Sequence, residues 1–202
     1  MLTKKEKVTI ASYDQTATQW VATHMNPDQC RTEFEIFRKY LPKGKVLEIG
    51  SGGGRDAKRF RDGGYDYTGI DVSPGLLEEA KKNNPGLTFL LQDIYQINFP
   101  ILFDGFWCAA TLLHIPKSRI HEALQSIHQV TKPNGVGFIC VKQGSGDMVL
   151  DKDDYGKRYF SYYTQDEFSK ILTSSGFFIL ETSILPISTK TTWINFFVKI
   201  EK

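Results

Sequence analysis

The stretch "VLEIGSGGGRDAKRF", Val46 to Phe60, constrains the fold more than any other part of this chain. An apolar run of strand type breaks into four glycines within five positions, and the charged residues that follow have helical spacing. Glycines at such a turn let the backbone approach a ligand closely, and the N–H groups at a helix start favour an anionic group. The stretch therefore predicts a ligand-binding turn between a strand and a helix.

Strand patterns recur after this turn at 66–71, 87–93, 103–111 and 132–143, with helical patterns between them. Repeated strand and helix units imply a parallel sheet with right-handed crossovers and helices on both faces. Such sheets bind ligands at the carboxyl ends of their strands, where the glycine turn lies. We therefore predict a three-layer α/β fold with its site at that edge.

Local signals mark several element ends. Ser73 is placed to cap one helix, and Thr164 with Glu167 forms a capping box at the start of another. The last two strand patterns, 177–185 and 191–200, follow one another without a helix. Because a parallel pair needs a long crossover, we expect these two strands to be antiparallel.

Charge is nearly balanced, with 25 lysines and arginines against 23 aspartates and glutamates. No strong attraction to nucleic acid or to an anionic membrane follows from this balance. The cluster of Lys4, Lys5 and Lys7 is interpreted as a solvated tail. We expect no nucleic-acid partner, no membrane, and a monomer or weak homodimer.

Cys30, Cys108 and Cys140 lie far apart, and two of them sit within apolar runs. Neither a disulfide framework nor a zinc pattern fits this spacing, and we expect no metal site. The N-terminal residues lack the apolar stretch of a signal peptide, and no segment approaches the ~20 apolar residues of a membrane span. A reduced, cytoplasmic setting is the simplest expectation.

The glycine pattern distinguishes between kinds of nucleotide site. A dinucleotide site needs G-x-G-x-x-G, whereas this chain has Gly50, Gly52 and Gly54, with Arg55 where the third glycine belongs. A P-loop is excluded, because no Gly-Lys-Ser or Gly-Lys-Thr follows. The loop therefore disfavours NAD and excludes the P-loop class of nucleotide site.

Two acids stand beside the loop. Asp71 ends the second strand, where a carboxylate can accept both ribose hydroxyls of an adenosine. Glu48 lies two residues before Gly50 and would repel a pyrophosphate, but it suits a ligand with an ammonium group. These acids favour an adenosine-type ligand that is zwitterionic at its other end.

Four stretches resemble, in order and spacing, the class I S-adenosylmethionine-dependent methyltransferases: "VLEIGSGGG", "YTGIDVSPGLLEEAK", "LLQDIYQINFP" and "FDGFWCAATLLHIPKSRIHEALQSIHQVTKPNG". The resemblance covers about Lys45 to Val141 and implies a Rossmann-like, seven-stranded, mostly parallel sheet with the last strand antiparallel. It also implies S-adenosylmethionine as the cofactor and methyl transfer as the activity. No Asn-Pro-Pro-Tyr motif follows the fourth strand, which argues against amino methylation of nucleic-acid bases.

The resemblance also implies which residues contact the cofactor. Arg55 would meet the methionine carboxylate, Asp71 the ribose, and Asp93 the adenine. Cys108 and Ala109 would form the wall beside the sulfonium. The full set implied in this way is Glu48, Gly50, Ser51, Gly52, Arg55, Asp71, Val72, Asp93, Ile94, Cys108 and Ala109, with Ala110 beside them.

The length of 202 residues and the hydrophobic content of 41% suit a single domain. Within it we expect four parts, which are an N-terminal helical lid at 1–44, a cofactor-binding core at 45–142, a substrate or lid loop at 143–163, and a C-terminal helix with an antiparallel strand pair at 164–202. The third part is the longest segment without periodicity, and long loops in compact domains are commonly functional.

Methyl transfer from a sulfonium is an in-line displacement, so alignment can supply much of its acceleration and a base is optional. His114 is the candidate base, although it could equally pack the turn before Pro116. Six aromatic residues of the two lid segments could enclose the site: Tyr13, Trp20, Tyr155, Tyr159, Tyr162 and Tyr163. We expect about half of these six to face the ligand. Tyr13 and Tyr159 complete the predicted catalytic set.

We predict a methyltransferase that acts on a small-molecule acceptor. Three alternatives stay open. They are an RNA or protein methyltransferase, a cofactor-binding protein without catalysis, and an NAD-dependent oxidoreductase, which Arg55 disfavours.

Overall fold

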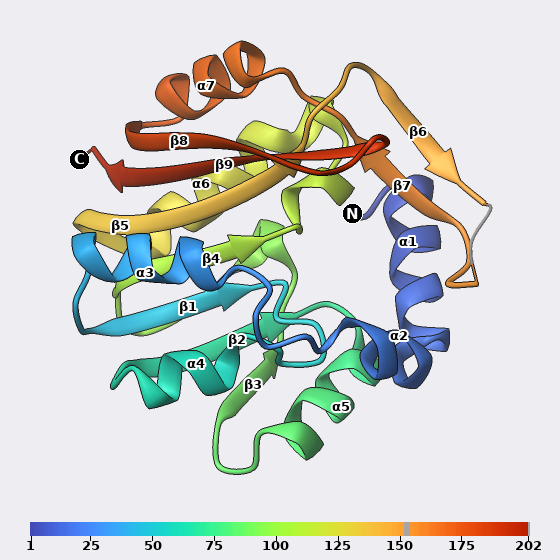
Figure 1. The fold of residues 1–202 in the computed structure, drawn as a ribbon, viewed down its shortest axis with the longest axis horizontal. Helices are drawn as coiled ribbons and strands as arrows, with labels where there is room; N and C mark the ends of the chain where they lie inside the picture. The colour runs from blue at the N-terminus through green and yellow to red at the C-terminus, as the bar shows by residue number, and fades with distance from the viewer. Residues whose placement is uncertain (152–153, 202) are drawn as a thin grey trace.

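The computed structural model describes residues 1–151 and 154–201, which Figure 1 shows as a ribbon. Its main sheet consists of β1 (Lys45–Ile49), β2 (Asp66–Asp71), β3 (Thr88–Leu91), β4 (Phe103–Ala109), β5 (Thr131–Lys142), β8 (Phe177–Ser188) and β9 (Thr191–Ile200). The strand order is β3-β2-β1-β4-β5-β9-β8. In this sheet β9 pairs antiparallel with β5 and β8, and the pairs among β1 to β5 are parallel. The predicted seven-stranded, mostly parallel sheet with its last strand antiparallel is confirmed.

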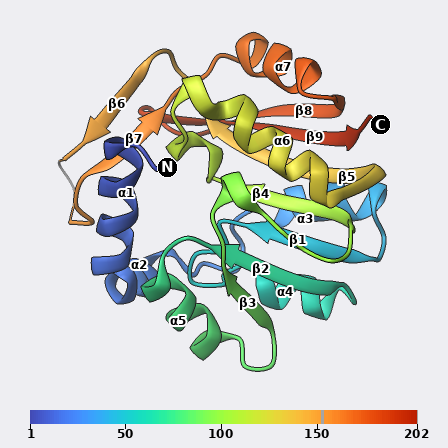
Figure 2. The same cartoon turned by 180° about the vertical axis from the view of Figure 1, so that it is seen from behind.

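Helices cover both faces of the sheet, as the two opposite views in Figures 1 and 2 show. One face packs against α3 (Arg31–Tyr40), α4 (Ala57–Asp62) and α5 (Pro74–Asn83), and the other against α6 (Ile120–Val130) and α7 (Gln165–Ser174). Because side chains alternate along a strand, Phe106 and Trp107 of β4 belong to opposite cores. Within the described residues, no helix combines the length and apolarity that a membrane crossing requires.

The helix starts follow the predicted signals only in part. The Ser73 hydroxyl caps α5 and accepts a hydrogen bond from the Leu76 N–H at 3.2 Å. The Thr164 hydroxyl accepts from the Glu167 N–H at 3.1 Å. The Glu167 carboxylate binds Lys117 Nζ at 2.7 Å instead of accepting a hydrogen bond from the Thr164 N–H. Half of the predicted capping box therefore forms, because an ion pair takes its second partner.

The N-terminal lysine cluster is not a solvated tail, so that interpretation is wrong. It lies on α1 (Lys4–Gln15), which is followed by α2 (Ala17–His24). A full capping box starts α1: the Glu6 N–H donates to the Thr3 hydroxyl at 3.3 Å, and the Thr3 N–H donates to the Glu6 carboxylate at 2.6 Å. The sequence contains this Thr-x-x-Glu pattern at Thr3 and Glu6, but the neighbouring lysines are also typical of an exposed tail.

The segment 143–163, predicted as a loop, holds an antiparallel strand pair. Its strands are β6 (Asp147–Leu150) and β7 (Arg158–Ser161), and residues 152–153 between them lie outside the described residues. The prediction of an irregular loop is therefore wrong. The pairing was hidden because β6 and β7 are only four residues long and carry no regular alternation of apolar and polar residues.

The strand β7 packs against α1, and the two lie side by side in both views (Figures 1 and 2). The Ser12 hydroxyl donates to the Lys157 carbonyl at 2.7 Å, and the Tyr159 N–H donates to the Thr9 hydroxyl at 2.9 Å. We call the strand pair β6 and β7 the hairpin. It forms, together with α1, one cover over the carboxyl ends of the strands.

Candidate active site

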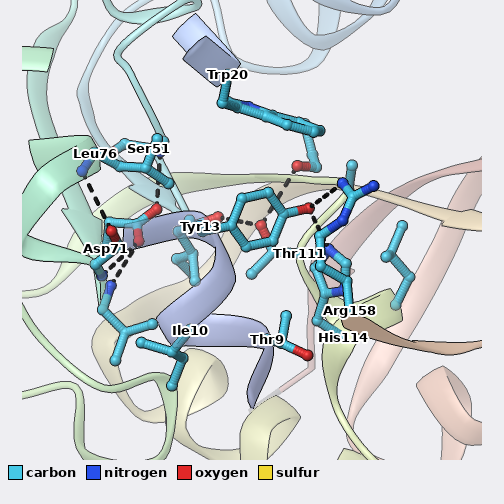
Figure 3. A pocket seen from close by; sticks show the side chains of 18 of the residues that line it. Thr9, Ile10, Tyr13, Trp20, Ser51, Asp71, Leu76, Thr111, His114 and Arg158 are labelled. Carbon is cyan, nitrogen blue, oxygen red and sulfur yellow. Dashed lines mark hydrogen bonds between the residues drawn. The ribbon is translucent and has the colours of Figure 1, made fainter. Parts of the chain in front are cut away.

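A cavity of about 530 Å³ lies at the carboxyl ends of the parallel strands, beneath α1, α2 and the hairpin. Figure 3 shows part of its lining from close by. We call one side of it the loop half, which is lined by Glu48, Gly50, Ser51, Gly52, Gly53, Arg55, Asp56, Asp71, Val72, Ser73, Gln92, Asp93 and Ile94. We call the other side the lid half, which is lined by Tyr13, Trp20, His114, Lys142, Tyr155, Arg158, Phe160 and Trp193.

Two glycines of the loop half have different reasons to be glycine. Both have positive φ, +73° at Gly50 and +52° at Gly52. A Cβ on Gly50 would lie 2.1 Å from the Thr111 hydroxyl, which donates to the Ile49 carbonyl at 3.0 Å. A Cβ on Gly52 would meet no atom within 4 Å and would enter open space. Gly50 therefore permits packing beneath the loop, whereas Gly52 leaves room for a ligand above it.

The hydroxyl of Ser51 is buried and makes no hydrogen bond with any residue that the structure describes. A buried polar atom without a partner is uncommon in a folded protein. Together with the open space at Gly52, it shows that the loop fits a ligand with polar groups.

Asp71 has its carboxylate fixed by main-chain donors. It accepts hydrogen bonds from the N–H groups of Gly52 at 2.8 Å, Val72 at 2.7 Å and Ser73 at 2.9 Å. Figure 3 shows these bonds at one end of the cavity. Burial raises the pKa of Asp71, and the three N–H groups oppose that rise. The backbone thus sets the orientation of a carboxylate that lines the cavity.

Glu48 lies deeper in the loop half and accepts a hydrogen bond from the Tyr67 hydroxyl. Burial raises the pKa of Glu48 well above its usual range, and the nearby charge of Asp56 adds to the rise. A cationic group of a ligand at this point would favour the ionised form of Glu48.

Arg55 has a protein partner that the sequence reading did not include. Its Nη2 lies 2.6 Å from the Asp56 carboxylate, which also accepts from Arg59 at 3.1 Å and from Trp107 Nε1 at 3.2 Å. Asp56 follows Arg55 directly in the sequence, but neighbouring opposite charges are common and gave no sign of a buried pair. Contact between Arg55 and a ligand carboxylate stays a prediction.

The structure brings most of the predicted cofactor residues together on the cavity wall. Those that line it are Glu48, Gly50, Ser51, Gly52, Arg55, Asp71, Val72, Asp93, Ile94, Ala109 and Ala110. Cys108 does not line it among the described contacts, so its predicted place beside the ligand is corrected. Because side chains alternate along β4, Cys108 points into the core near Leu112, and burial raises the pKa of its thiol to about 12.

Tyr159 is also placed differently from the prediction. On β7, Arg158 and Phe160 face the cavity, so the Tyr159 side chain between them points away from it. Its hydroxyl accepts from the Ser161 hydroxyl at 3.0 Å, and Lys5 Nζ lies 4.7 Å from its ring centroid. The predicted catalytic side chain therefore contributes only its main chain to the site.

His114 is held between two partners whose chemistry fixes its tautomer. Its Nδ1 lies 2.7 Å from the Tyr159 carbonyl, which can only accept, so Nδ1 carries the proton. In the neutral ring, Nε2 then accepts from the Tyr13 hydroxyl at 2.9 Å. The Tyr13 oxygen in turn accepts from Arg158 at 3.3 Å. Figure 3 shows this chain of contacts around Tyr13.

The environment keeps the His114 ring neutral. Burial, together with the nearby charges of Arg158 and Lys142, lowers the pKa of His114 to about 4. At neutral pH the ring is therefore a hydrogen-bond acceptor at Nε2 and a weak base.

Three of the six aromatic candidates line the cavity: Tyr13, Trp20 and Tyr155. Trp20 makes edge contacts with the other two rings at 5.0 and 4.9 Å. Sequence patterns did not indicate several further lining residues, among them His24, Tyr95, Lys142, Arg158, Phe160 and Trp193. No local pattern marks them, because they come from five separate elements. Among the described residues, no three metal-binding side chains come together.

Known proteins match the chain most clearly in its core. Residues 46–135 match a family model described as a methyltransferase domain. An uncharacterized methyltransferase of Oceanobacillus iheyensis is 35% identical over 95 residues, which are 46% of this chain and 44% of that protein. The eEF1A lysine and N-terminal methyltransferase of Mus musculus is 35% identical over 147 residues, covering 66% of this chain. The chain spans 44% and 20% of the lengths of these two relatives.

A solved structure extends the match to the whole fold. The 1,6-didemethyltoxoflavin-N1-methyltransferase of Burkholderia thailandensis, crystallised with 1,6-didemethyltoxoflavin and S-adenosylhomocysteine, matches with a TM-score of 0.81. The match covers 100% of this chain and 92% of that chain at 18% identity, a level at which it shows the fold alone.

The fold and the cavity define an α/β protein with a glycine-loop ligand site beneath a helical lid. Residues 46–135, which match the methyltransferase domain, carry the resemblance to the class I S-adenosylmethionine-dependent methyltransferases, and a solved methyltransferase structure shares the fold. The resemblance of the four sequence stretches to that family is confirmed.

Proposed function

We propose that this protein transfers a methyl group from S-adenosylmethionine to a small-molecule acceptor. The observation that carries the proposal is that one cavity has two unlike halves: a polar loop half at the strand ends and an aromatic lid half that faces it. The first suits a zwitterionic adenosine cofactor, and the second suits an organic acceptor.

The residues of the loop half fit the cofactor. Asp71 would accept the ribose hydroxyls, and Asp93 with Ile94 would contact the adenine. Glu48 would favour the ammonium group, while the Ser51 hydroxyl and the space at Gly52 suit the methionine portion. Bound S-adenosylmethionine would supply an electrophilic methyl group on a sulfonium.

The lid half would align the acceptor and exclude water. The rings of Tyr13 and Trp20 offer faces that attract a cation and an apolar surface that displaces water. The cover of α1, α2 and the hairpin limits the acceptor to what the cavity can enclose. The bound 1,6-didemethyltoxoflavin in the Burkholderia thailandensis relative supports a small-molecule acceptor.

A protein acceptor is the second candidate, supported by the identity with the eEF1A lysine and N-terminal methyltransferase. The cover over the cavity disfavours it, because a folded protein would have to present a residue past α1 and the hairpin. The free cysteines support the proposed reduced, cytoplasmic setting.

Titration calorimetry with S-adenosylhomocysteine tests the cofactor first. We expect micromolar or tighter binding at one site per chain, and no binding would overturn the proposal. Release of S-adenosylhomocysteine from S-adenosylmethionine is then compared between a small-molecule library and a lysate protein fraction. The same comparison is made with S-adenosylmethionine labelled on its methyl group, and transfer of that label to protein alone would favour the second candidate.

A further inference from the structure

Four apolar side chains lie where the cavity passes between the hairpin and the end of the β8–β9 pair, which lies beside β7 in both views (Figures 1 and 2). Leu150 of β6 and Ile187 of β8 line the cavity, although Ile187 is 60% exposed. Met148 and Leu185 are the other two, and they are 46% and 42% exposed. We call these four side chains the apolar mouth.

The strand registers place Met148 and Leu185 on the cavity side. Met148 pairs with Phe160 across the hairpin, and Leu185 pairs with Trp193 across the β8–β9 pair. Both partners line the cavity. Because directly opposite residues of an antiparallel pair point to the same face, Met148 and Leu185 continue the lining outward from the cavity.

The two walls of the apolar mouth belong to one passage. The Nζ of Lys142 lies 4.5 Å from the ring centroid of Phe160 on the hairpin and 5.7 Å from that of Trp193 on β9. One ammonium group thus touches a ring from each wall. The apolar mouth therefore extends the lid half to the surface of the molecule.

This continuity gives the exposed side chains a meaning. Single exposed apolar residues are normal, whereas apolar residues gathered beside a cavity are typical of a ligand groove. Covering them removes apolar surface from water, and each methylene group that a ligand buries fully raises its affinity about fourfold. Since the surface is continuous with the cavity, part of the ligand in the cavity is its natural occupant.

We propose that the methyl acceptor is an amphipathic small molecule whose alkyl chain lies in the apolar mouth while its methyl-accepting head lies in the lid half. The inference rests on the proposed function and names its substrate class. The order of the lining supports it. The hydroxyl of Tyr13 and Nε2 of His114, 2.9 Å apart, lie within the lid half, and Leu150 and Ile187 lie toward the surface.

The test uses phenol, 4-ethylphenol, 4-butylphenol and 4-hexylphenol on the protein saturated with S-adenosylhomocysteine. These probes share one head and differ only in the length of the chain. Titration calorimetry, with quenching of tryptophan fluorescence as a second readout, gives the affinities. A half-buried methylene group adds about twofold, so we expect 4-hexylphenol to bind at least ~30-fold more tightly than phenol.

Variants locate the chain. Ile187→Ser should weaken 4-hexylphenol binding about fivefold and leave phenol binding unchanged, because it removes apolar surface from one wall only. Ile184→Ser is the matched control on the same strand. Ile184 is 49% exposed, but it pairs with Ile194 of the core on the opposite face, so this change should alter neither affinity. Leu150→Ser tests the facing wall, after thermal melting has shown that the variant folds, and should act as Ile187→Ser does.

Each remaining outcome overturns a stated claim. If S-adenosylhomocysteine binds but the affinity of the phenols does not rise with chain length, or none of the phenols binds, the alkyl-bearing acceptor is wrong and the proposed function stands. If Ile187→Ser weakens 4-hexylphenol no more than Ile184→Ser does, the chain does not lie in the apolar mouth. If S-adenosylhomocysteine itself does not bind, the proposed function fails, and this inference fails with it.

Discussion

The loop half and the lid half of the cavity are built by different means. The loop half comes from one stretch of chain, Glu48 to Ile94, and main-chain N–H groups fix its carboxylate Asp71. The lid half comes from segments far apart in the chain: Tyr13 and His114 are 101 positions apart, and their bond is made between side chains. Local sequence thus determines one half, and tertiary packing determines the other.

This difference has a chemical counterpart. The loop half presents acids and main-chain groups in fixed positions, as a constant ligand requires. The lid half presents rings and cations on a cover that is attached by a few hydrogen bonds, such as that from the Tyr159 N–H to the Thr9 hydroxyl. We therefore expect changes in the loop half to alter cofactor binding and changes in the lid half to alter acceptor binding.

The largest effect is expected from Asp71→Ala in the loop half. Loss of two hydrogen bonds to a charged acceptor costs about 4 kcal/mol, so the affinity for S-adenosylhomocysteine should fall roughly 1000-fold. The variant also leaves the N–H groups of Gly52, Val72 and Ser73 without their acceptor, which should lower the free energy of unfolding by about 2 kcal/mol. Calorimetry and urea unfolding measure the two effects.

Asp71→Asn is the control for this variant. It keeps one oxygen that can accept from the loop, so its stability should stay closer to that of the wild type, while its affinity falls by about tenfold. An Asp71→Ala protein that binds S-adenosylhomocysteine within threefold of the wild type would show that the ribose is held elsewhere.

The next effect concerns His114 in the lid half and is a dependence of stability on pH. The folded protein holds the pKa of His114 at about 4, below its ordinary value of 6.5, so the unfolded chain takes up the proton first as the pH falls. The contribution is therefore complete above pH 6.5 and is lost as the pH falls toward 4. Between pH 7.5 and pH 4 this amounts to about 3 kcal/mol of unfolding free energy.

His114→Asn isolates this contribution, because asparagine does not titrate and its amide can still donate to the Tyr159 carbonyl. Urea unfolding at several pH values should show that the wild type loses about 3 kcal/mol more than the variant. Equal losses in the two proteins would mean that folding does not lower the pKa of His114.

The same difference explains what the sequence could predict. The glycine loop, Asp71 and the strand ends were predictable, because spacing within a few residues reports the turn and the side of each strand. Arg158 was not, because its place in the cavity depends on β7 pairing with β6 and packing against α1. Cys108 was assigned to the right strand end and Tyr159 to a loop, but the alternation of side chains along β4 and β7 turns both away from the cavity.

A smaller effect should follow from Gly52→Ala. At φ of +52° an alanine costs about 1–2 kcal/mol of stability, and its methyl group enters the open space of the loop half. Gly64→Ala is a close control, because Gly64 has φ of +80° and equally open surroundings but lies outside the cavity lining. Both variants should lose similar stability, and only Gly52→Ala should lose about tenfold in affinity for S-adenosylhomocysteine. Equal affinities in the two variants would place the ligand away from the loop.

The smallest effect is expected where the cover is attached. Thr9→Val keeps the shape of the side chain but removes the acceptor of the buried Tyr159 N–H, which should cost about 1 kcal/mol of stability. Because Arg158 and Phe160 share β7 with Tyr159, their positions should loosen, and methyl transfer to an acceptor found in the library screen should slow a few-fold at saturating S-adenosylmethionine. The affinity for S-adenosylhomocysteine itself should not change.

Thr173→Val is the matched change on α7, where the Thr173 hydroxyl donates to the Ser169 carbonyl at 3.0 Å on an exposed face. It should leave the affinity for S-adenosylhomocysteine and the rate of methyl transfer as they are. If Thr9→Val instead weakens S-adenosylhomocysteine binding by the same factor as methyl transfer, the cover holds the cofactor as well as the acceptor. The two halves would then be one coupled site, in which tertiary packing also determines how the loop binds its ligand.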